Sequence, residues 1–584
     1  MSSTYMHYNS GPASLPNDYA ILSQYLSSQR PSDSGLESTG DEDLPETEDE
    51  AEHEVNCLSG EAVGSGVRKA SFGGHSMRSP HWKAPEQEPL LADIPRIDED
   101  WDVVSQDGAD TWALWIQEGS IIARYTLPVF GTHLLEYSLS MVSVISIGHL
   151  GTTQLAAATL GSMTSSVTGL SIILGFVSAL DSLLPQAWTT NPSLVGLWSQ
   201  RMTLLMIITL IPIFLTWFNA EYILIFLHQD PEIAHLAGIY LRWLSIGLPA
   251  YAFNAVARRY LQSQGLLHVP TAIVLIVAPL MCSSTGSLVC SFFITLRFIL
   301  KFSISMGTGW GATWLHRSPL ATGLSFNLIA LCTLIYAVAF APRVAWHPIG
   351  RASFKNLGIL VQLGLASVGQ LASEWWSWEL VGLAASFLGP ASLATQSVLL
   401  VTCSTSYQAP YALSVAASVR IGNLLGAGHA SRAKAATSVA LLFSLGLGLF
   451  FSIILLTFRA KWGYIFNDDP EVISLVAHIL PLCSVFQIFD GLCSVTAGVM
   501  RSRGRQSIGA LLNFSAYYII GIPLGLVLTF RFGMELYGLW IGLAAALLYG
   551  AIFSVWLVLR TDWDREVQRV AARLAADNKC QVVA

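Results

Sequence analysis

The sequence predicts an all-α membrane protein with twelve transmembrane helices in two parallel six-helix lobes around a central cavity. Three observations predict this fold: an apolar composition, twelve apolar segments of membrane-spanning length, and an internal repeat. Hydrophobic residues make up 53% of the 584 residues and charged residues 12%, whereas a soluble domain carries about 25% charged residues. The 18 Trp and 26 Phe residues are typical of a protein with aromatic belts at the membrane interfaces.

Residues 1–117 predict a disordered, acidic cytosolic tail, because they are rich in Ser, Pro, Glu and Asp and show no sustained apolar period. Residues 37–54 hold ten carboxylates and no Lys or Arg, so the net charge of −8 comes mostly from this end of the chain. The chain shows no basic patch, which excludes nucleic acid as a partner. Glu86, Leu90 and Leu91 have the spacing of an acidic dileucine sorting signal, which favours the vacuolar membrane over the plasma membrane.

Twelve apolar segments follow the tail, each close to the ~20 residues that span the hydrocarbon core of a bilayer. They form an expected N-lobe at 118–345 and C-lobe at 346–560, followed by a cytosolic C-terminal tail at 561–584. Lys and Arg gather in alternate loops, which indicates that both termini lie in the cytosol. The segments lie at 121–147, 154–184, 202–219, 234–256, 269–296, 320–341, 355–386, 391–418, 436–458, 472–499, 507–530 and 535–559.

The two lobes resemble each other at an offset of about 238 residues. Glu136 falls on Glu374, and with one further residue Asp230-Pro231-Glu232 falls on Asp469-Pro470-Glu471. Because six helices per lobe is an even number, both lobes enter the membrane in the same orientation. Parallel repeats of this kind are frequent in secondary transporters, in which two rocking lobes expose a central cavity to each side of the membrane in turn.

Short motifs in both lobes point to a known family. The first lobe contains Gln229-Asp230-Pro231-Glu232 and Tyr260-Leu261-Gln262-Ser263-Gln264. The second lobe contains Glu374-Trp375-Trp376-Ser377-Trp378-Glu379 and the run from Ser414 to Asn423. Together the motifs resemble those of the multidrug and toxic compound extrusion (MATE) transporters, especially the eukaryotic branch. The resemblance covers residues 120–558 apart from one gap.

This resemblance implies a secondary active antiporter that exports organic, cationic small molecules, xenobiotics or metabolites, in exchange for protons by alternating access. The expected partners are the organic substrate, H⁺ and the lipid bilayer, for a monomer with no cofactor and no metal site. One alternative is a lipid-linked flippase of the same superfamily. The Asp-Pro-Glu and Glu-Trp-Trp signatures disfavour this alternative. The other is a membrane-embedded enzyme, but the sequence shows no nucleotide-binding loop and no metal-ligand cluster.

Residues 281–318 depart from the family's pattern. Arg297 and Lys301 would lie in or beside the fifth helix, where the resemblance implies an Asn-rich helix end, a short loop and a Gly-Ala-Pro-like entry to the sixth helix. Two hypotheses remain: a gene-model error such as translated intron sequence, or a lineage-specific insertion. Sequencing the transcript distinguishes them.

Carboxylates inside apolar segments are the candidates for proton coupling and substrate binding, because an acid inside a membrane is costly and usually functional. Glu374 lies in an otherwise apolar and aromatic segment, at a position where the resemblance implies a coupling acid. Asp490 shares one helix face with Gln487 and Ser494, which predicts a polar stripe along a wet cavity. Glu379 is a further candidate, although it points about 140° away from Glu374 on a helix.

Glu136, the repeat counterpart of Glu374, is either a second protonatable group or a hydrogen-bonded contact between helices. Two acids that other family members carry are absent here, since Val401 and Ser143 occupy those positions. A carboxylate in a low-dielectric cavity favours its protonated form, so a proton and an organic cation would compete for the remaining acids.

Aromatic and charged residues complete the set of candidates. Trp378, Tyr407 and Tyr517 are expected to line the cavity with Gln487, and aromatic ring faces attract cations. Asp181 and Arg420 lie at nearly equivalent repeat positions at the cytosolic ends of their helices. They are expected either to form an inner gate or to cap helix ends and join the lobes through ion pairs.

Overall fold

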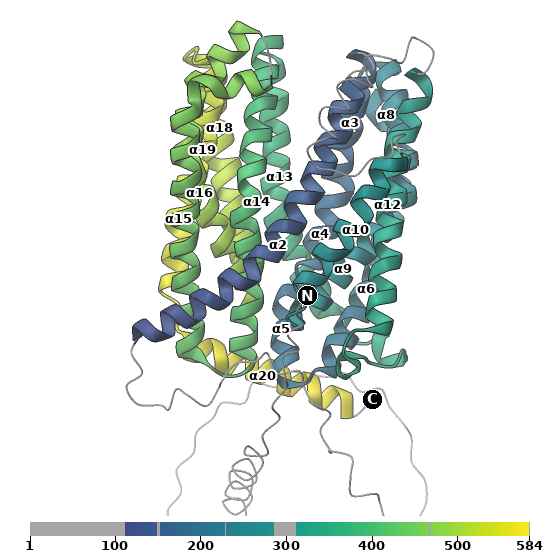
Figure 1. The fold of residues 1–584 in the computed structure, drawn as a ribbon, viewed down its shortest axis with the longest axis vertical. Helices are drawn as coiled ribbons and strands as arrows, with labels where there is room; N and C mark the ends of the chain where they lie inside the picture. The colour runs from purple at the N-terminus through teal and green to yellow at the C-terminus, as the bar shows by residue number, and fades with distance from the viewer. Residues whose placement is uncertain (1–110, 149–151, 228, 285–310, 467–468, 583–584) are drawn as a thin grey trace, which may run out of the picture. The chain divides into compact units, whose positions relative to one another are not determined.

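The computed structural model describes a chain of helices joined by short connections (Figure 1). No strand occurs among the residues that it describes. The predictions for residues 1–110 of the acidic tail, which include the dileucine pattern, and for most of the atypical segment lie outside the described residues. The described residues are 111–148, 152–227, 229–284, 311–466 and 469–582.

Several helices of the first half are interrupted rather than continuous. A π-helical turn at Ser166–Leu170 joins α3 to α4, and a 3-10 turn at Ser245–Gly247 joins α8 to α9. Pro249 stands in the first turn of α9, where its missing N–H costs no hydrogen bond. The helices are α2 (Thr111–Gly148), α3 (Thr152–Ser165), α4 (Ser171–Val177), α5 (Leu180–Thr190), α6 (Ser193–Phe218), α7 (Ala220–Phe226), α8 (Pro231–Leu244), α9 (Leu248–Ser263), α10 (His268–Ser284) and α12 (Gly311–Ala339).

The second half consists of longer helices around a core that includes Phe486 and Trp540. α16 packs against α14, α15 and α19, and therefore lies at the centre of this half. A π-helical segment at Ser515–Gly521 joins α17 to α18. The helices are α13 (Leu357–Ser386), α14 (Pro390–Gly426), α15 (Ala430–Trp462), α16 (Pro470–Ser502), α17 (Gln506–Phe514), α18 (Ile522–Leu526), α19 (Glu535–Leu559) and α20 (Trp563–Val582).

Helical structure extends beyond the expected lobe boundaries at both ends. α2 begins at Thr111, inside the expected N-terminal tail, and α20 occupies the expected C-terminal tail. α20 is amphipathic rather than apolar: its apolar side buries Val570 and Leu574, and it packs against α5, α14 and α15 (Figure 1). A surface helix of this kind lacks the continuous apolar run that marks a membrane span.

The internal repeat is visible in the way equivalent helices begin and end. Asp230 and Asp469 cap α8 and α16, and each accepts a hydrogen bond of 2.9 Å from the backbone N–H two residues later. Gly265 and Gly504 follow α9 and α16 with φ angles of 77° and 72°, a left-handed conformation that glycine adopts without strain. The repeated Asp-Pro-Glu motif therefore has a structural role as a helix start in both halves.

Eight helical stretches of the described residues are long and apolar enough to cross a membrane. The other helices at predicted spans carry more polar groups or are shorter. α14 is rich in Ser, Thr and Gln, α9 carries Arg258 and Arg259, and His268–Val277 is a shorter apolar helix. The eight stretches are Leu160–Thr190, Ser193–Phe218, Thr322–Ala339, Leu357–Ser386, Ala430–Ile465, Pro470–Ser502, Gln506–Arg531 and Glu535–Leu559.

Helix α2 contacts both halves of the chain. Near its start, the fully buried Glu118 pairs with Arg420 of α14 at 2.8 Å and with Arg432 of α15 at 3.1 Å. Farther along, Thr132 of α2 hydrogen-bonds Thr271 of α10 at 2.6 Å. The charged cluster of Glu118, Arg420 and Arg432 therefore anchors the first helix of the first half onto the second half.

Replacing Glu118 by Gln is expected to destabilise the protein by about 3–5 kcal/mol, because it leaves buried arginine charge without a carboxylate. Thermal unfolding of the purified protein in detergent measures this loss as a lower midpoint temperature.

The matched control is Glu221→Gln, which removes a more exposed carboxylate that pairs with Arg242 at 3.2 Å. Surface pairs of this kind contribute up to about 1 kcal/mol. Equal losses in the two variants would contradict a structural role for the buried cluster.

Candidate functional site

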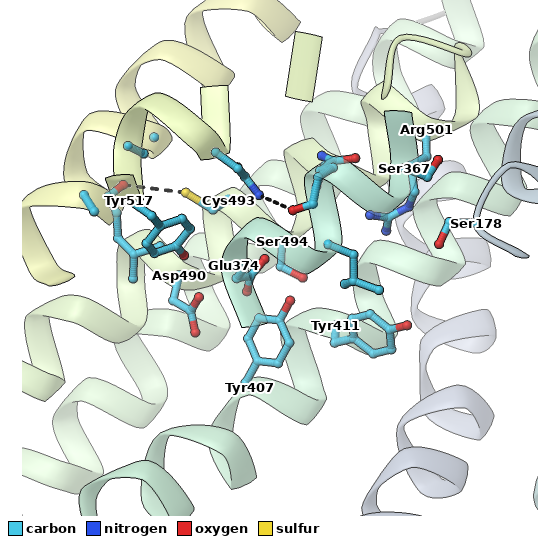
Figure 2. A pocket seen from close by; sticks show the side chains of 18 residues that line it. Ser178, Ser367, Glu374, Tyr407, Tyr411, Asp490, Cys493, Ser494, Arg501 and Tyr517 are labelled. Atoms are coloured by element: carbon cyan, nitrogen blue, oxygen red, sulfur yellow. Dashed lines mark hydrogen bonds between the residues drawn. The ribbon is translucent and has the colours of Figure 1, made fainter. Parts of the chain in front are cut away.

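A small cavity lies among α13, α14, α16 and the π-helical segment after α17 (Figure 2). Its volume is about 40 Å³. Pockets for drug-sized ligands measure about 300–1,000 Å³, so in this conformation the cavity has room for water but not for an organic molecule. The side chains with the chemistry of interest in its lining are Glu374, Tyr407, Tyr411, Asp490, Ser494 and Tyr517.

The two carboxylates of this cavity form no ion pair with the residues that the structure describes. Asp490 is 6% exposed and Glu374 is partly buried, and both line the same space. In the part of the chain that the structure describes, neither forms an ion pair with Arg, Lys or His. An ionised carboxylate in such a place carries a large desolvation cost. A proton or a bound cation would remove that cost, so the pair is suited to exchanging one for the other.

Glu374 faces the cavity because bulky residues hold other faces of α13. Trp378 packs edge-on against Phe486 and Trp540, with ring centroids 5.6 and 5.9 Å away. Trp376 donates a hydrogen bond of 3.2 Å to the carbonyl of Val167 in the first half. The tryptophans of this motif therefore fix the rotation of α13, and Trp378 is part of an aromatic core instead of the cavity wall.

Three tyrosines form the aromatic part of the wall. Tyr407 stacks on Tyr411 with ring centroids 5.9 Å apart, and His133 of α2 packs edge-on against Tyr411. Tyr517 is 3% exposed and lies in the π-helical segment, a local irregularity that often occurs at functional sites. Ring faces beside carboxylates form a surface that attracts organic cations.

The halves of the chain are joined close to this cavity by a second group of polar contacts, the Asp181 closure. Asp181 of α5 pairs with Arg259 of α9 at 2.9 Å and with Arg501 of α16 at 3.2 Å. Gln186 of α5 donates a hydrogen bond of 2.7 Å to the carbonyl of Ser502. Arg501 also lines the cavity, so one side chain contacts both the closure and the site of the carboxylates.

Close helix packing reinforces the Asp181 closure. A Cβ atom at Gly175 of α4 would lie 2.6 Å from the Cα atom of Val368 in α13. Gly364 of α13 lies equally tightly against the ring of Phe176. Small residues let membrane helices approach closely, and here they bring α4 of the first half against α13 of the second.

The structure places the remaining sequence candidates elsewhere. Arg420 pairs with Glu118, whereas Asp181 pairs with Arg259 and Arg501. Each residue therefore takes part in an ion pair that joins the two halves, and among the described contacts the two residues do not pair with each other. Glu379 and Gln487 lie outside the lining of the cavity.

Glu136 is bound to Arg258 of α9 by two hydrogen bonds, and His133 lies 3.7 Å from it. This pairing supports the second of the alternatives for Glu136, a contact between helices.

Sequence reasoning did not identify Arg501, Tyr411, Gln370 and Asn513, which also line the cavity. In the sequence, Arg501 reads only as one of the basic residues at the end of an apolar segment. Tyr411 lies one helical turn after Tyr407, a spacing that puts both rings on one face and was available in the sequence. No group of three His, Cys, Asp or Glu residues that is suited to hold a metal occurs within the described ranges.

Comparison with known proteins identifies the family. The family model described as MatE matches residues 128–283 and 366–527. The chain belongs to the MATE family. It is therefore an efflux transporter that crosses the membrane several times, and not an enzyme. The first matched range ends at residue 283, near the start of the segment that departs from the family's pattern.

Relatives and a solved structure agree with this assignment. Multidrug and toxin extrusion protein 2 of Mus musculus is 32% identical over 78% of this chain and 77% of its own length. Protein DETOXIFICATION 17 of Arabidopsis thaliana is 33% identical over 77% of this chain and 92% of its own. The crystal structure of the eukaryotic MATE transporter AtDTX14 matches with a TM-score of 0.70 and 28% identity, covering 79% of this chain and 99% of that one. The predicted MATE fold of twelve helices in two lobes is thus confirmed.

Replacing Gly175 by Ala is expected to destabilise the packed state of α4 on α13 by about 1–3 kcal/mol, because the added methyl group meets backbone atoms. Thermal unfolding in detergent measures this effect.

The matched control is Gly382→Ala in α13, where an added Cβ has no neighbour within 4 Å. There the change is expected to be neutral or to stabilise the helix by up to about 1 kcal/mol. A Gly175→Ala protein that unfolds at the wild-type temperature would show that α4 and α13 are not in tight contact.

Proposed function

We propose that this MATE protein exports organic cations in exchange for protons, and that Glu374 and Asp490 are the groups for which cation and proton compete. The observation that carries the proposal is that two carboxylates, neither of which forms an ion pair among the described residues, lie in one cavity walled by tyrosines. The names of its relatives, which refer to multidrug and toxin extrusion, support organic small molecules as the substrate class.

Competition for the same carboxylates is sufficient to couple the two fluxes. A cavity of about 40 Å³ accommodates protonated carboxyl groups but no substrate. When the halves separate at the Asp181 closure, the space around the acids widens and an organic cation enters. The cation then displaces the protons, because both stabilise the same negative charge.

The end of the bundle that carries the Asp181 closure is proposed to face the cytosol. Arg259, Arg501, Arg503 and Arg505 cluster at this end, and membrane proteins concentrate Lys and Arg on their cytosolic side. Both termini then lie in the cytosol. The dileucine pattern supports the vacuolar membrane as the location, and the protein is proposed to act as a monomer.

Reconstitution into proteoliposomes tests the proposal. A pH gradient is imposed, and accumulation of a fluorescent organic cation is followed. Wild-type protein is expected to accumulate the cation only when the gradient is present. Glu374→Gln and Asp490→Asn are each expected to lower the gradient-driven rate by about tenfold or more, equivalent to about 1.4 kcal/mol.

Glu379→Gln is the matched control, because it removes a carboxylate of the same helix that lies outside the cavity. Its rate is expected to stay close to that of the wild type. Uptake that ignores the pH gradient would overturn proton coupling, and full activity of Glu374→Gln would overturn the site.

A further inference from the structure

A second cavity lies apart from the transport site, where α16 and α19 end and where α17 and α20 begin. Its volume is about 270 Å³. The lining contains five arginines and two acids, which gives a formal charge of +3. We call it the arginine pocket, and its cationic residues are Arg503, Arg505, Arg560, Arg565 and Arg569.

A single carboxylate, that of Glu566, forms ion pairs with three of these arginines. Oε1 of the buried Glu566 lies 3.0 Å from Arg503, 3.1 Å from Arg505 and 2.8 Å from Arg569. Burial alone would raise the pKa of the Glu566 carboxyl. The three guanidinium groups outweigh this effect and lower the pKa. The carboxylate is therefore permanently ionised at neutral pH, and it still leaves most of the positive charge around it uncompensated.

The other residues of the lining do not neutralise the excess positive charge of the arginine pocket. Asp562 pairs with Arg565 at 2.9 Å. Arg560 has the ring of Trp556 as its neighbour, with its guanidinium carbon 4.7 Å from the ring centroid. Cation–π contact stabilises a cation without neutralising it. The excess positive charge therefore persists at the outer side of the pocket.

Arg503 shows that this charge reaches a buried position. The residue is 9% exposed, and its Nε atom has no hydrogen-bond partner among the described residues. Burial, together with the charges of Arg505 and Arg569, lowers the pKa of the Arg503 guanidinium despite the contact with Glu566. A buried donor without a partner is unfavourable, and a bound anion would satisfy it.

The number and kind of cations indicate which anion fits. Guanidinium groups match phosphate oxygens through paired hydrogen bonds, and arginine clusters are the usual recognition device for phosphate groups. Basic pockets at the ends of membrane helices are suited to phosphorylated lipid headgroups. Ile508 of α17 and Leu557 of α19 also line the pocket, so it borders the apolar surface of spanning helices.

We propose that the arginine pocket binds a phosphate-bearing ligand at the membrane surface, either a phosphorylated lipid headgroup or a soluble polyphosphate. Its walls come from the ends of α16 and α19, the start of α17 and the start of α20. A bound phosphate group would therefore hold α20 onto the helices of the second half. This site is separate from Glu374 and Asp490, and it does not depend on proton coupling.

The experiment uses the full chain purified in detergent and fluorescent phosphatidylinositol bisphosphate as the lipid probe. Inositol trisphosphate and inorganic phosphate are the soluble probes. The variant is Arg560→Gln with Arg565→Gln, because neither side chain contributes to the buried ion pairs of Glu566. Loss of two charge-assisted contacts is expected to weaken probe binding by about tenfold or more.

The matched control is Arg459→Gln with Lys461→Gln, which removes the same charge from exposed positions at the end of α15. Thermal unfolding verifies that each variant is folded. If the double variant does not fold, the single Arg560→Gln variant replaces it in the binding measurements. Binding of the lipid probe alone assigns a lipid headgroup, and equal binding of inositol trisphosphate assigns a soluble ligand. Equal affinity of the pocket variant and the control, or no binding of any probe, would overturn the proposal.

Discussion

An acid inside a membrane protein must be neutralised by a neighbouring residue, a proton or a bound cation, and this requirement organises the described chain. Glu118, Glu136 and Asp181 are each neutralised by arginine, and each joins separate helices. Glu374 and Asp490 share their cavity with Arg501, but among the described residues neither forms an ion pair with it or with another Arg, Lys or His. This contrast separates the acids that hold helices together from the pair on which the proposed exchange depends.

Arg501 links these two groups of acids. It pairs with Asp181 across the halves, donates a hydrogen bond of 3.1 Å to Ser414 and lines the cavity of the carboxylates. Arg501 therefore connects the cavity of the carboxylates to the contact that joins the halves. In the proposed cycle, a cation beside Glu374 weakens the attraction between that carboxylate and Arg501 and so favours a different arrangement of α5 and α16.

The sequence predicted the fold well, because apolar length and an internal repeat are properties of the chain itself. It also selected Glu374 and Asp490 as candidates, since an acid in an apolar segment stands out without knowledge of its neighbours, and the structure places both in the lining of one cavity. It did not predict that Arg420 pairs with Glu118 or that Trp378 packs in a core, because partners of long side chains are decided by tertiary packing. The sequence did not predict α20 for another reason. Its apolar side is too narrow to resemble a membrane-spanning helix.

The central claim is that protons and organic cations compete for the same two carboxylates. The most direct measurement is proton release from the purified protein in weakly buffered detergent solution when an organic cation binds, followed with a pH indicator. The account predicts that wild-type protein releases protons in proportion to the cation bound, and that the Glu374→Gln, Asp490→Asn double variant releases none. Cation binding by the wild type without proton release would contradict it.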